Sequence, residues 1–313
     1  MKKHKIEFIP EFKKVFLSPR YWFTWLVLGG VAVFSILPPS IRDPVLAKIG
    51  YWAGNLSKNA RCRVQINLAL CFPEKSDAER REITDNMFAT ALQSIVMLAE
   101  LVIRGPEKFQ ERVCWKGEKI LEKIQCNNKN VIFLVPHGWF VDIPAMLLAA
   151  RGQKMAAMFH HQRNPVIDYV WNSVRRKFGG RLHARSDGIN PFIQSVLQGY
   201  WGYYLPDQDY GPEHSEFVDF FATYKATLPI IGRLMNISKA EIIPLFPVYD
   251  MKKHLLTIEV RPPMESIAGA DNKTIARQIN KEIEILVGAH PEQYVWVLKL
   301  LKTRKSNEAE PYP

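Results

Sequence analysis

A histidine in a turn after an apolar strand is the feature of this sequence that best suits catalysis. The apolar run 131–135, rich in β-branched residues, predicts a buried strand that Pro136 and Gly138 end. His137 lies in that turn, and Asp142 follows it at the start of an apolar helical run. An imidazole has an unperturbed pKa of about 6.5, so it can accept a proton from a hydroxyl near neutral pH. A carboxylate beside the ring would fix its tautomer and stabilise the imidazolium.

The spacing between these two residues limits how they can meet. Side chains pair on one face of a continuous helix at i and i+4, which is shorter than the separation of His137 and Asp142. A dyad therefore needs the histidine in the turn and the aspartate on the first helical turn, pointing back. The sequence contains no Gly-x-Ser-x-Gly motif, so the expected nucleophile is a substrate hydroxyl that His137 activates. The alternative is a histidine with only a structural hydrogen bond, and the spacing alone does not decide between them.

A basic segment, 169–186, contains no acidic residue. Arginine binds phosphate and carboxylate oxygens through two parallel N–H bonds, so Arg175 and Arg185 are candidate ligands for an anionic substrate. The simpler interpretation is a solvated helix face followed by a loop. A nucleic-acid site is disfavoured because aromatic residues are not interleaved with the basic ones at a stacking spacing.

Two carboxylates, Asp207 and Asp209, lie in a Pro-Asp-Gln-Asp-Tyr-Gly-Pro loop after the strand candidate 201–205. Such a pair can orient basic side chains, accept hydrogen bonds from sugar hydroxyls or bind a cation. The calcium-loop template does not fit, because glycine is fifth rather than sixth and no glutamate is twelfth. We therefore predict no metal, and we expect Asp207 to contact Arg175 and hold it in place. An ordinary turn built on Asp, Gly and Pro is the alternative.

The composition favours a large domain with an anionic partner. The 313 residues are 47% hydrophobic and carry a net charge of +11, which suits an acidic membrane surface, a phosphorylated lipid or nucleic acid. The four cysteines form no Cys-x-x-Cys pair, so we expect reduced thiols in a cytosol-facing protein.

The N-terminus predicts a membrane-anchoring helix. Basic residues precede a charge-free run, 21–41, whose apolar core 21–37 is at the short end for a membrane span. Tyr21, Trp22 and Trp25 are typical of an interfacial aromatic belt, and no Ala-x-Ala cleavage site follows. A buried or interfacial helix is the alternative. Because basic residues flank both ends, charge alone does not orient the helix. We expect residues 1–42 to form this basic and anchoring segment and 43–313 one catalytic domain.

Strand and helix patterns alternate along the rest of the chain. They predict an α/β fold with a central, mostly parallel or mixed sheet flanked by helices. The Ser76–Glu79 capping box predicts the start of a long helix that ends before Gly105-Pro106. Asp43-Pro44 predicts another helix start. The expected strands are 113–115, 131–135, 155–159, 201–205, 241–248 and 255–260, and the other helices are 119–124, 141–150, 164–178, 272–287 and 291–301.

Several of these motifs together resemble a known family. The His-x₄-Asp pattern of His137 and Asp142 resembles the signature of the glycerolipid acyltransferase superfamily. The loop 206–212, followed by Phe-x-x-Phe-Phe at 217–221 and Ala-Thr at 226–227, resembles the late acyltransferases of lipid A biosynthesis. The similarity extends from Pro-Arg-Tyr-Trp at 19–22 to Lys-Thr-Arg at 302–304 and, within the family, is greatest to the myristoyltransferases.

This resemblance implies a specific reaction and site. It implies a glycerolipid-acyltransferase-like fold, in which the His137–Asp142 dyad acts as general base and Arg175 is also catalytic. A fatty acyl chain, myristoyl, would pass from acyl carrier protein to a hydroxyl of a Kdo-bearing phosphorylated lipid A precursor. Arg185, Asp207 and Asp209 would bind substrate. No cofactor is expected besides the thioester co-substrate, and no nucleic acid. The location would be the bacterial inner membrane, with the catalytic domain on the cytoplasmic side.

Two other functions remain open at this point. A glycerophosphate or lysophospholipid O-acyltransferase would share the dyad but lack the Asp-Gln-Asp loop. A membrane lipid-binding protein without catalysis would explain the charge and the anchor. An aromatic cluster from Phe217 to Ile231 could line an acyl channel, although such a cluster is more often part of the core.

Overall fold

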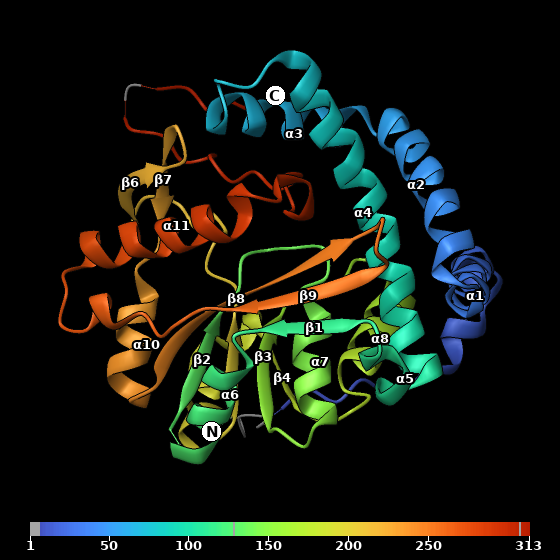
Figure 1. Cartoon of the computed structure of the whole chain (residues 1–313), viewed down its shortest axis with the longest axis horizontal. Coiled ribbons are helices and arrows are strands. Elements are labelled where there is room, and N and C mark those ends of the chain that lie inside the picture. Colours follow the sequence, from blue (N-terminus) through green and yellow to red (C-terminus); the bar gives the residue numbers. More distant parts are fainter. Residues whose placement is uncertain (1–6, 128, 307) are drawn as a thin grey trace.

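A seven-stranded sheet forms the centre of the molecule (Figure 1). The computed structural model describes residues 7–127, 129–306 and 308–313. The strand order is β1-β9-β8-β2-β5-β3-β4, in which the last five strands are mutually parallel and β9 runs antiparallel to β8. The predicted mostly parallel central sheet flanked by helices is therefore confirmed. The strands are β1 (Val113–Lys116), β2 (Val131–Leu134), β3 (Met155–Phe159), β4 (Arg181–Ala184), β5 (Trp201–Tyr204), β8 (Glu241–Asp250) and β9 (Leu255–Val260).

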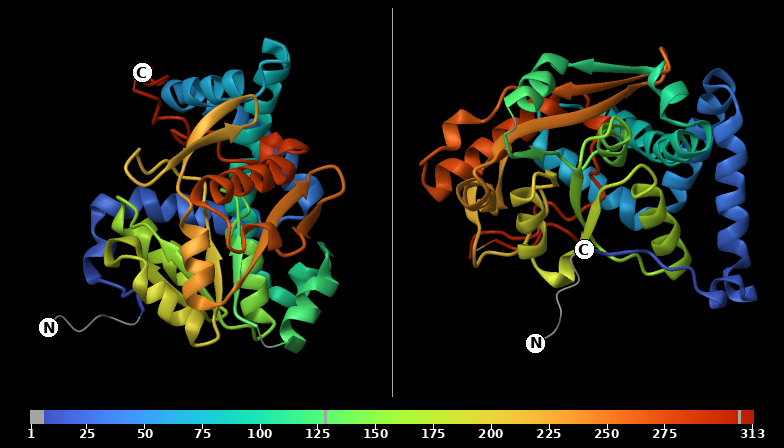
Figure 2. Two further views of the ribbon diagram at one scale, coloured as in Figure 1. Left: turned by 90° about the vertical axis from the view of Figure 1, so that its left-hand side faces the viewer. Right: turned by 90° about the horizontal axis from the view of Figure 1, so that it is seen from below.

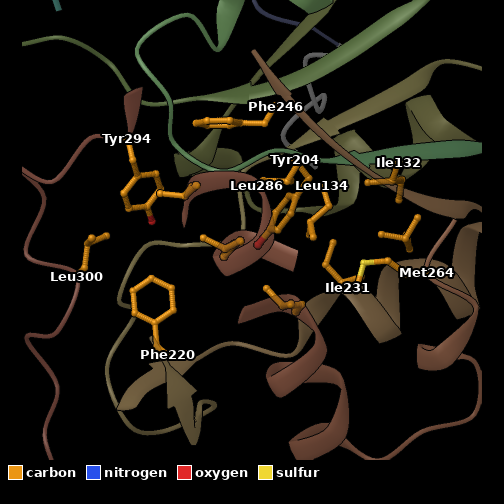
Figure 3. Packing of buried hydrophobic residues seen from close by; sticks show 14 of the residues in the cluster. Ile132, Leu134, Tyr204, Phe220, Ile231, Phe246, Met264, Leu286, Tyr294 and Leu300 are labelled. Carbon is orange, nitrogen blue, oxygen red and sulfur yellow. The ribbon is translucent and has the colours of Figure 1, made fainter. Parts of the chain in front are cut away.

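The central strand β2 is apolar throughout because both of its faces are buried. Val131 and Phe133 pack into one hydrophobic cluster, whereas Ile132 and Leu134 pack into the other, and all four side chains are inaccessible to solvent. Figure 3 shows Ile132 and Leu134 among the side chains of the second cluster. A strand held from both sides in this way gives the turn that follows it a rigid base.

Helices cover both faces of the sheet, which separates the two clusters. One face is covered by α5 (Pro106–Gln110), α6 (Glu118–Asn127) and α7 (Asp142–Ala150), with α8 (Pro165–Arg175) packed beside them. The other face is covered by α3 (Lys58–Cys71), α9 (Asn190–Leu197), α10 (Ile230–Ser238) and α11 (Asn272–Gly288). The long helix α4 (Asp77–Arg104) contributes its first half to one cluster and its second half to the other. Its predicted capping box is confirmed, because Ser76 and Glu79 exchange hydrogen bonds.

Two N-terminal helices, α1 (Trp22–Ile36) and α2 (Pro39–Leu56), pack on the outer side of α4 (Figures 1 and 2). The helix α2 runs beside α4, whereas α1, seen end-on in Figure 1, crosses it. Gly50 and Gly54 permit the close approach of α2, since a Cβ at Gly50 would lie 2.6 Å from the backbone oxygen of Phe88. In the described part of the chain α4 alone is long and apolar enough to cross a membrane, but 56% of its apolar window is buried, as in a core helix. The 15 residues of α1 span about 22 Å, less than the ~30 Å hydrocarbon core. The predicted anchoring helix therefore remains a prediction.

Some predicted elements differ from the structure. The predicted helix 291–301 is wrong: it is only the short turn η5 (Pro291–Gln293), followed by an extended segment whose backbone bonds to the turn after β2. The predicted helix start at Asp43-Pro44 is also wrong, because α2 begins at Pro39 and Asp43 is buried within it. The expected domain boundary after residue 42 lies inside α2, so this division stays a prediction. Sequence patterns missed β4, α9, α10 and the hairpin of β6 (Glu216–Phe220) and β7 (Thr223–Thr227).

Candidate active site

His137 and Asp207 meet because they follow two neighbouring parallel strands. β2 ends at Leu134 and β5 ends at Tyr204, and these two residues are paired in register. His137 and Asp207 each lie three residues beyond the end of their strand, so they reach the same edge of the sheet. The carboxyl edge of a parallel sheet is where such folds place their ligand sites.

Asp207 is a buried carboxylate that receives three hydrogen bonds. Its Oδ1 accepts from Nδ1 of His137, and its Oδ2 accepts from the backbone N–H of His137 at 2.7 Å and from the Tyr294 hydroxyl at 2.7 Å. Burial alone would raise the pKa of Asp207, but His137 and the hydrogen bonds outweigh it, so the pKa lies below 3.8. Asp207 is therefore a carboxylate at neutral pH and holds the imidazole from behind.

A directional chain of hydrogen bonds fixes the tautomer of His137. Arg185 can only donate, and it donates to Oε1 of Gln208, so the amide NH₂ of Gln208 faces His137. That NH₂ lies 3.4 Å from Nε2 of His137, which therefore accepts. The ring proton is then on Nδ1 and is donated to Asp207. The neutral imidazole thus presents its lone pair on the side opposite Asp207, as a general base requires.

The structure corrects both predicted pairings of the carboxylates. Asp142 accepts from Nε of Arg175 at 2.8 Å, from Nη2 of Arg175 at 3.1 Å and from the Trp171 indole at 2.9 Å. The predicted His137–Asp142 contact is therefore wrong, and so is the predicted Asp207–Arg175 contact. The reason is that Asp142 opens α7 and is directed toward α8, whereas Asp207 comes from the strand next to β2. Asp207 therefore binds His137 and Asp142 binds Arg175, which is the reverse of the predicted pairing.

Three of the predicted site residues line one cavity of about 400 Å³: His137, Arg175 and Arg185. Gln208 and Tyr210 also line it, and the guanidinium of Arg185 lies 5.0 Å from the centre of the Tyr210 ring. Asp142 is not in its wall but lines a smaller adjoining apolar cavity of about 80 Å³, together with Arg175. The cavity thus carries a base on one side and two guanidinium groups, which suits an anionic substrate or a developing negative charge.

Asp209 braces the loop rather than facing the cavity. Its Oδ1 accepts from the backbone of Gly211 at 3.0 Å and from the Thr303 hydroxyl at 2.7 Å, and its Oδ2 accepts from the Thr303 backbone at 2.7 Å. These bonds attach the C-terminal segment to the loop. The substrate-binding roles expected of Asp207 and Asp209 stay predictions, because the described contacts of both carboxylates are within the protein.

The segment 293–295 closes the site from the C-terminal side. The backbone N–H of Val295 donates to His137 at 2.8 Å, the N–H of Trp139 donates to Gln293 at 3.0 Å, and Gly138 and Tyr294 form a β-bridge. Sequence reasoning missed Tyr294, because nothing in its local pattern distinguishes it from the helix predicted there. Gln208 was also missed, although its place between two aspartates in the loop was a usable signal.

A buried lysine, Lys225 on β7, is a third residue that the sequence did not reveal. It is inaccessible to solvent, and its burial lowers the pKa of its ammonium group, an effect that the charges of Asp207 and Asp209 oppose. Of the predicted channel residues, Phe220 and Ile231 are fully buried in the core, whereas Leu228 lines the cavity. Phe221 packs against the core, whereas Phe217 and Tyr224 are half-buried outside it, so the predicted aromatic cluster is only partly core.

Comparison with known proteins yields consistent matches over nearly the whole chain. The sequence profile described as "Bacterial lipid A biosynthesis acyltransferase" matches residues 9–303. The chain is 80% identical over 314 aligned residues to "Lipid A biosynthesis acyltransferase 2" of Shigella flexneri, covering 100% of both chains. It is 66% identical over 311 aligned residues to "Lipid A biosynthesis myristoyltransferase" of Escherichia coli K12, covering 99% of this chain and 96% of the relative. It is 28% identical to "Lipid A biosynthesis lauroyltransferase" of the same organism, covering 95% and 96%.

Proposed function

The chain belongs to the bacterial lipid A biosynthesis acyltransferases, and we propose that it transfers myristoyl from acyl carrier protein to a hydroxyl of a Kdo-bearing lipid A precursor. The main support for this reaction is the series of hydrogen bonds that joins Asp207, His137 and Gln208. This series leaves Nε2 of His137 as a hydrogen-bond acceptor at the cavity. The myristoyl group is supported by the 66% identity to the Escherichia coli myristoyltransferase, against 28% to the lauroyltransferase.

His137 acts as the general base in this proposal. Its Nε2 takes the proton of the acceptor hydroxyl while the oxygen attacks the thioester carbonyl, forming the C–O bond. Collapse of the tetrahedral intermediate breaks the C–S bond, and the departing thiolate takes the proton back from His137. Asp207, fully buried behind the ring, stabilises the imidazolium in between. Asp207 thus takes the place that the sequence suggested for Asp142.

Arg175 is positioned to stabilise the oxyanion. In the described part of the chain its hydrogen-bond partner is Asp142, through Nε and Nη2, so Nη1 remains for the cavity that Arg175 lines. The backbone N–H groups of Gly138 and Trp139 are already used, because they donate to the carbonyls of Pro136 and Gln293. A guanidinium held in advance by a carboxylate costs little reorganisation when negative charge develops.

Arg185 is the proposed ligand of an acidic group of the acceptor. It lines the cavity beside His137, and a phosphate or a Kdo carboxylate offers the paired oxygens that a guanidinium binds. The net charge of +11 favours such an acceptor and also favours docking of an acidic carrier protein.

Attachment to the inner membrane is proposed through α1 and α2 together. Fifteen of the twenty large apolar side chains that the described residues expose lie between Ile9 and Leu56. On α2 they form one stripe along the face opposite to α4, which is typical of a helix that lies in a membrane surface. The stripe consists of Ile41, Val45, Ile49, Trp52 and Leu56. The proposed acyl donor is a cytosolic carrier protein, so we propose that the catalytic domain faces the cytoplasm.

A transfer assay with the purified full-length protein tests this function. Myristoyl and lauroyl carrier protein are offered to a Kdo-bearing penta-acylated lipid A precursor, with lysophosphatidic acid as a competing acceptor. We expect transfer of myristate to the precursor, lost in His137→Ala and kept in His214→Ala, which removes an exposed histidine. Preference for laurate would keep the family and change the donor, and acylation of lysophosphatidic acid alone would refute the acceptor. Precursor binding without turnover would favour a binding protein.

A further inference from the structure

Gln208 covers the atom that the reaction needs. Its amide NH₂ lies 3.4 Å from Nε2 of His137, and both side chains line the cavity through which an acceptor hydroxyl must approach that nitrogen. A lone pair that already accepts one hydrogen bond is not free to accept a proton from a second donor. The described arrangement is therefore a resting state, from which the carboxamide has to move before a hydroxyl can take its position.

The orientation of Gln208 is set by Arg185. The guanidinium donates to Oε1 of Gln208, and it also lies over the ring of Tyr210, which limits the directions it can take. Without that donor the carboxamide could rotate and turn its oxygen toward His137. Arg185 thus determines which end of the amide meets Nε2.

We propose that Gln208 caps Nε2 of His137 in the acceptor-free enzyme, and that an anionic group of the acceptor releases the cap by taking Arg185 from Gln208. This inference rests on the proposed role of His137 as general base. It makes Arg185 and Gln208 positioning residues: an acceptor with a phosphate or carboxylate at the right distance uncovers the base, whereas water or a neutral alcohol does not.

The exchange is chemically balanced at Arg185. The guanidinium loses a neutral amide oxygen and gains a charged oxygen, and hydrogen bonds to ionised acceptors are roughly twice as strong as those to neutral ones. The acceptor hydroxyl then replaces the N–H of Gln208 at Nε2, so the nitrogen stays hydrogen-bonded throughout. The cost of releasing the cap is one long hydrogen bond at the weak end of the range, which changes an equilibrium about two- to threefold.

The rate at which diethyl pyrocarbonate modifies His137 measures directly whether Gln208 covers Nε2. The reagent acylates an accessible, unprotonated imidazole nitrogen, and peptide mass spectrometry gives the rate at His137 without any turnover. We expect Gln208→Ala to raise this rate about two- to threefold over wild type in the absence of substrate. The matched control is Gln198→Ala. The side-chain oxygen of Gln198 also accepts a hydrogen bond from an arginine, Arg181, at 2.5 Å. Arg181 begins β4, so this pair lies at the amino edge of the sheet, away from His137. Its rate should equal that of wild type.

Two further measurements test the coupling to Arg185. Arg185→Ala should raise the His137 rate as well, and the double variant Arg185→Ala/Gln208→Ala should react no faster than Gln208→Ala alone. Inorganic phosphate, compared with chloride at equal ionic strength, should accelerate the reaction in wild type and have no effect in Gln208→Ala. Thermal unfolding identifies any variant that is not folded, and Gln208→Met then serves as a replacement of similar volume without the N–H donor.

An unchanged His137 rate in folded Gln208→Ala would overturn the cap. Additive effects in the double variant, or protection by phosphate in wild type, would overturn the link to Arg185. Failure of the cap can be told apart from failure of the proposed function, because that function fails if His137→Ala retains full transfer, whereas the cap is measured on the nitrogen itself.

Discussion

Replacing Asp207 by asparagine should stop catalysis while leaving the shape of the site intact. The Oδ2 position of Asp207 receives two donors, the backbone N–H of His137 and the Tyr294 hydroxyl, each at 2.7 Å. The amide oxygen of an asparagine is the only atom that can accept both, so its NH₂ must face Nδ1 of His137. That nitrogen then has to accept, which moves the ring proton to Nε2, where the base should be.

The expected loss follows from this change of tautomer. In a serine protease triad the same Asp→Asn change leaves the geometry intact and lowers kcat by about 10⁴, which corresponds to about 5.4 kcal/mol of transition-state stabilisation. Asp142→Asn provides the contrast, because Asp142 binds Arg175 and Trp171 instead of His137. Weakening that charge-assisted pair should cost about 10- to 100-fold.

The assay is initial-rate transfer of the acyl chain from carrier protein to the lipid A precursor, with saturating donor, for both variants and wild type. Circular dichroism and thermal unfolding confirm that each variant is folded. The reasoning would be refuted by the reverse ranking, in which Asp142→Asn loses more than 10³-fold and Asp207→Asn less than tenfold. That result would restore Asp142 as the partner of His137 in the catalytic state.

Further predictions concern the support of the site and the N-terminal helices. Tyr294→Phe removes one donor to the Asp207 carboxylate, so transfer should fall about three- to tenfold in the same assay. Because folding lowers the pKa of Asp207 below its ordinary value, its contribution to stability is complete above the ordinary carboxyl pKa and is lost as the pH falls through the folded-state pKa. The urea midpoints of wild type and Asp207→Asn should therefore differ at pH 7 and converge as the pH is lowered through the acid range. Gly50→Ala places a methyl group 2.6 Å from a backbone oxygen of α4 and should lower the free energy of unfolding by about 1–3 kcal/mol, measured by urea titration. Trp52→Glu should reduce flotation with anionic vesicles, whereas Ile285→Glu, at an exposed apolar position on α11, should not.

The elements around the site were largely predictable because their signals are local. The strand at 131–134 is apolar on both faces, and the capping box at Ser76 marks the start of α4. The segment after Pro291 was not predictable, because its apolar residues resemble a helix face, whereas its backbone is held by bonds to the turn at His137. Such bonds join residues about 160 positions apart, and no local pattern records them.

The partner of His137 was mispredicted for the same physical reason. Asp142 is the carboxylate nearest to His137 in the sequence. The carboxylate nearest in space is set by strand order, because Asp207 follows β5, the strand that lies beside β2. The sequence did indicate that both aspartates and Arg175 belong to one region. It could not indicate which aspartate binds His137 and which binds Arg175, because that depends on which helix ends and strand ends face each other in the fold.

The observed exchange of partners gives the cavity two separate hydrogen-bonded pairs. Asp207 contacts His137 at the carboxyl edge of the sheet, and Asp142 contacts Arg175 from the start of α7, so each of the two basic side chains has its own buried or half-buried carboxylate. A single carboxylate shared by both could not orient the imidazole and hold the guanidinium in place at once. Separate carboxylates allow a proton to be taken on one side of the cavity while negative charge develops on the other. This division is what acyl transfer to a hydroxyl requires, since proton removal and oxyanion formation occur on different atoms in the same step.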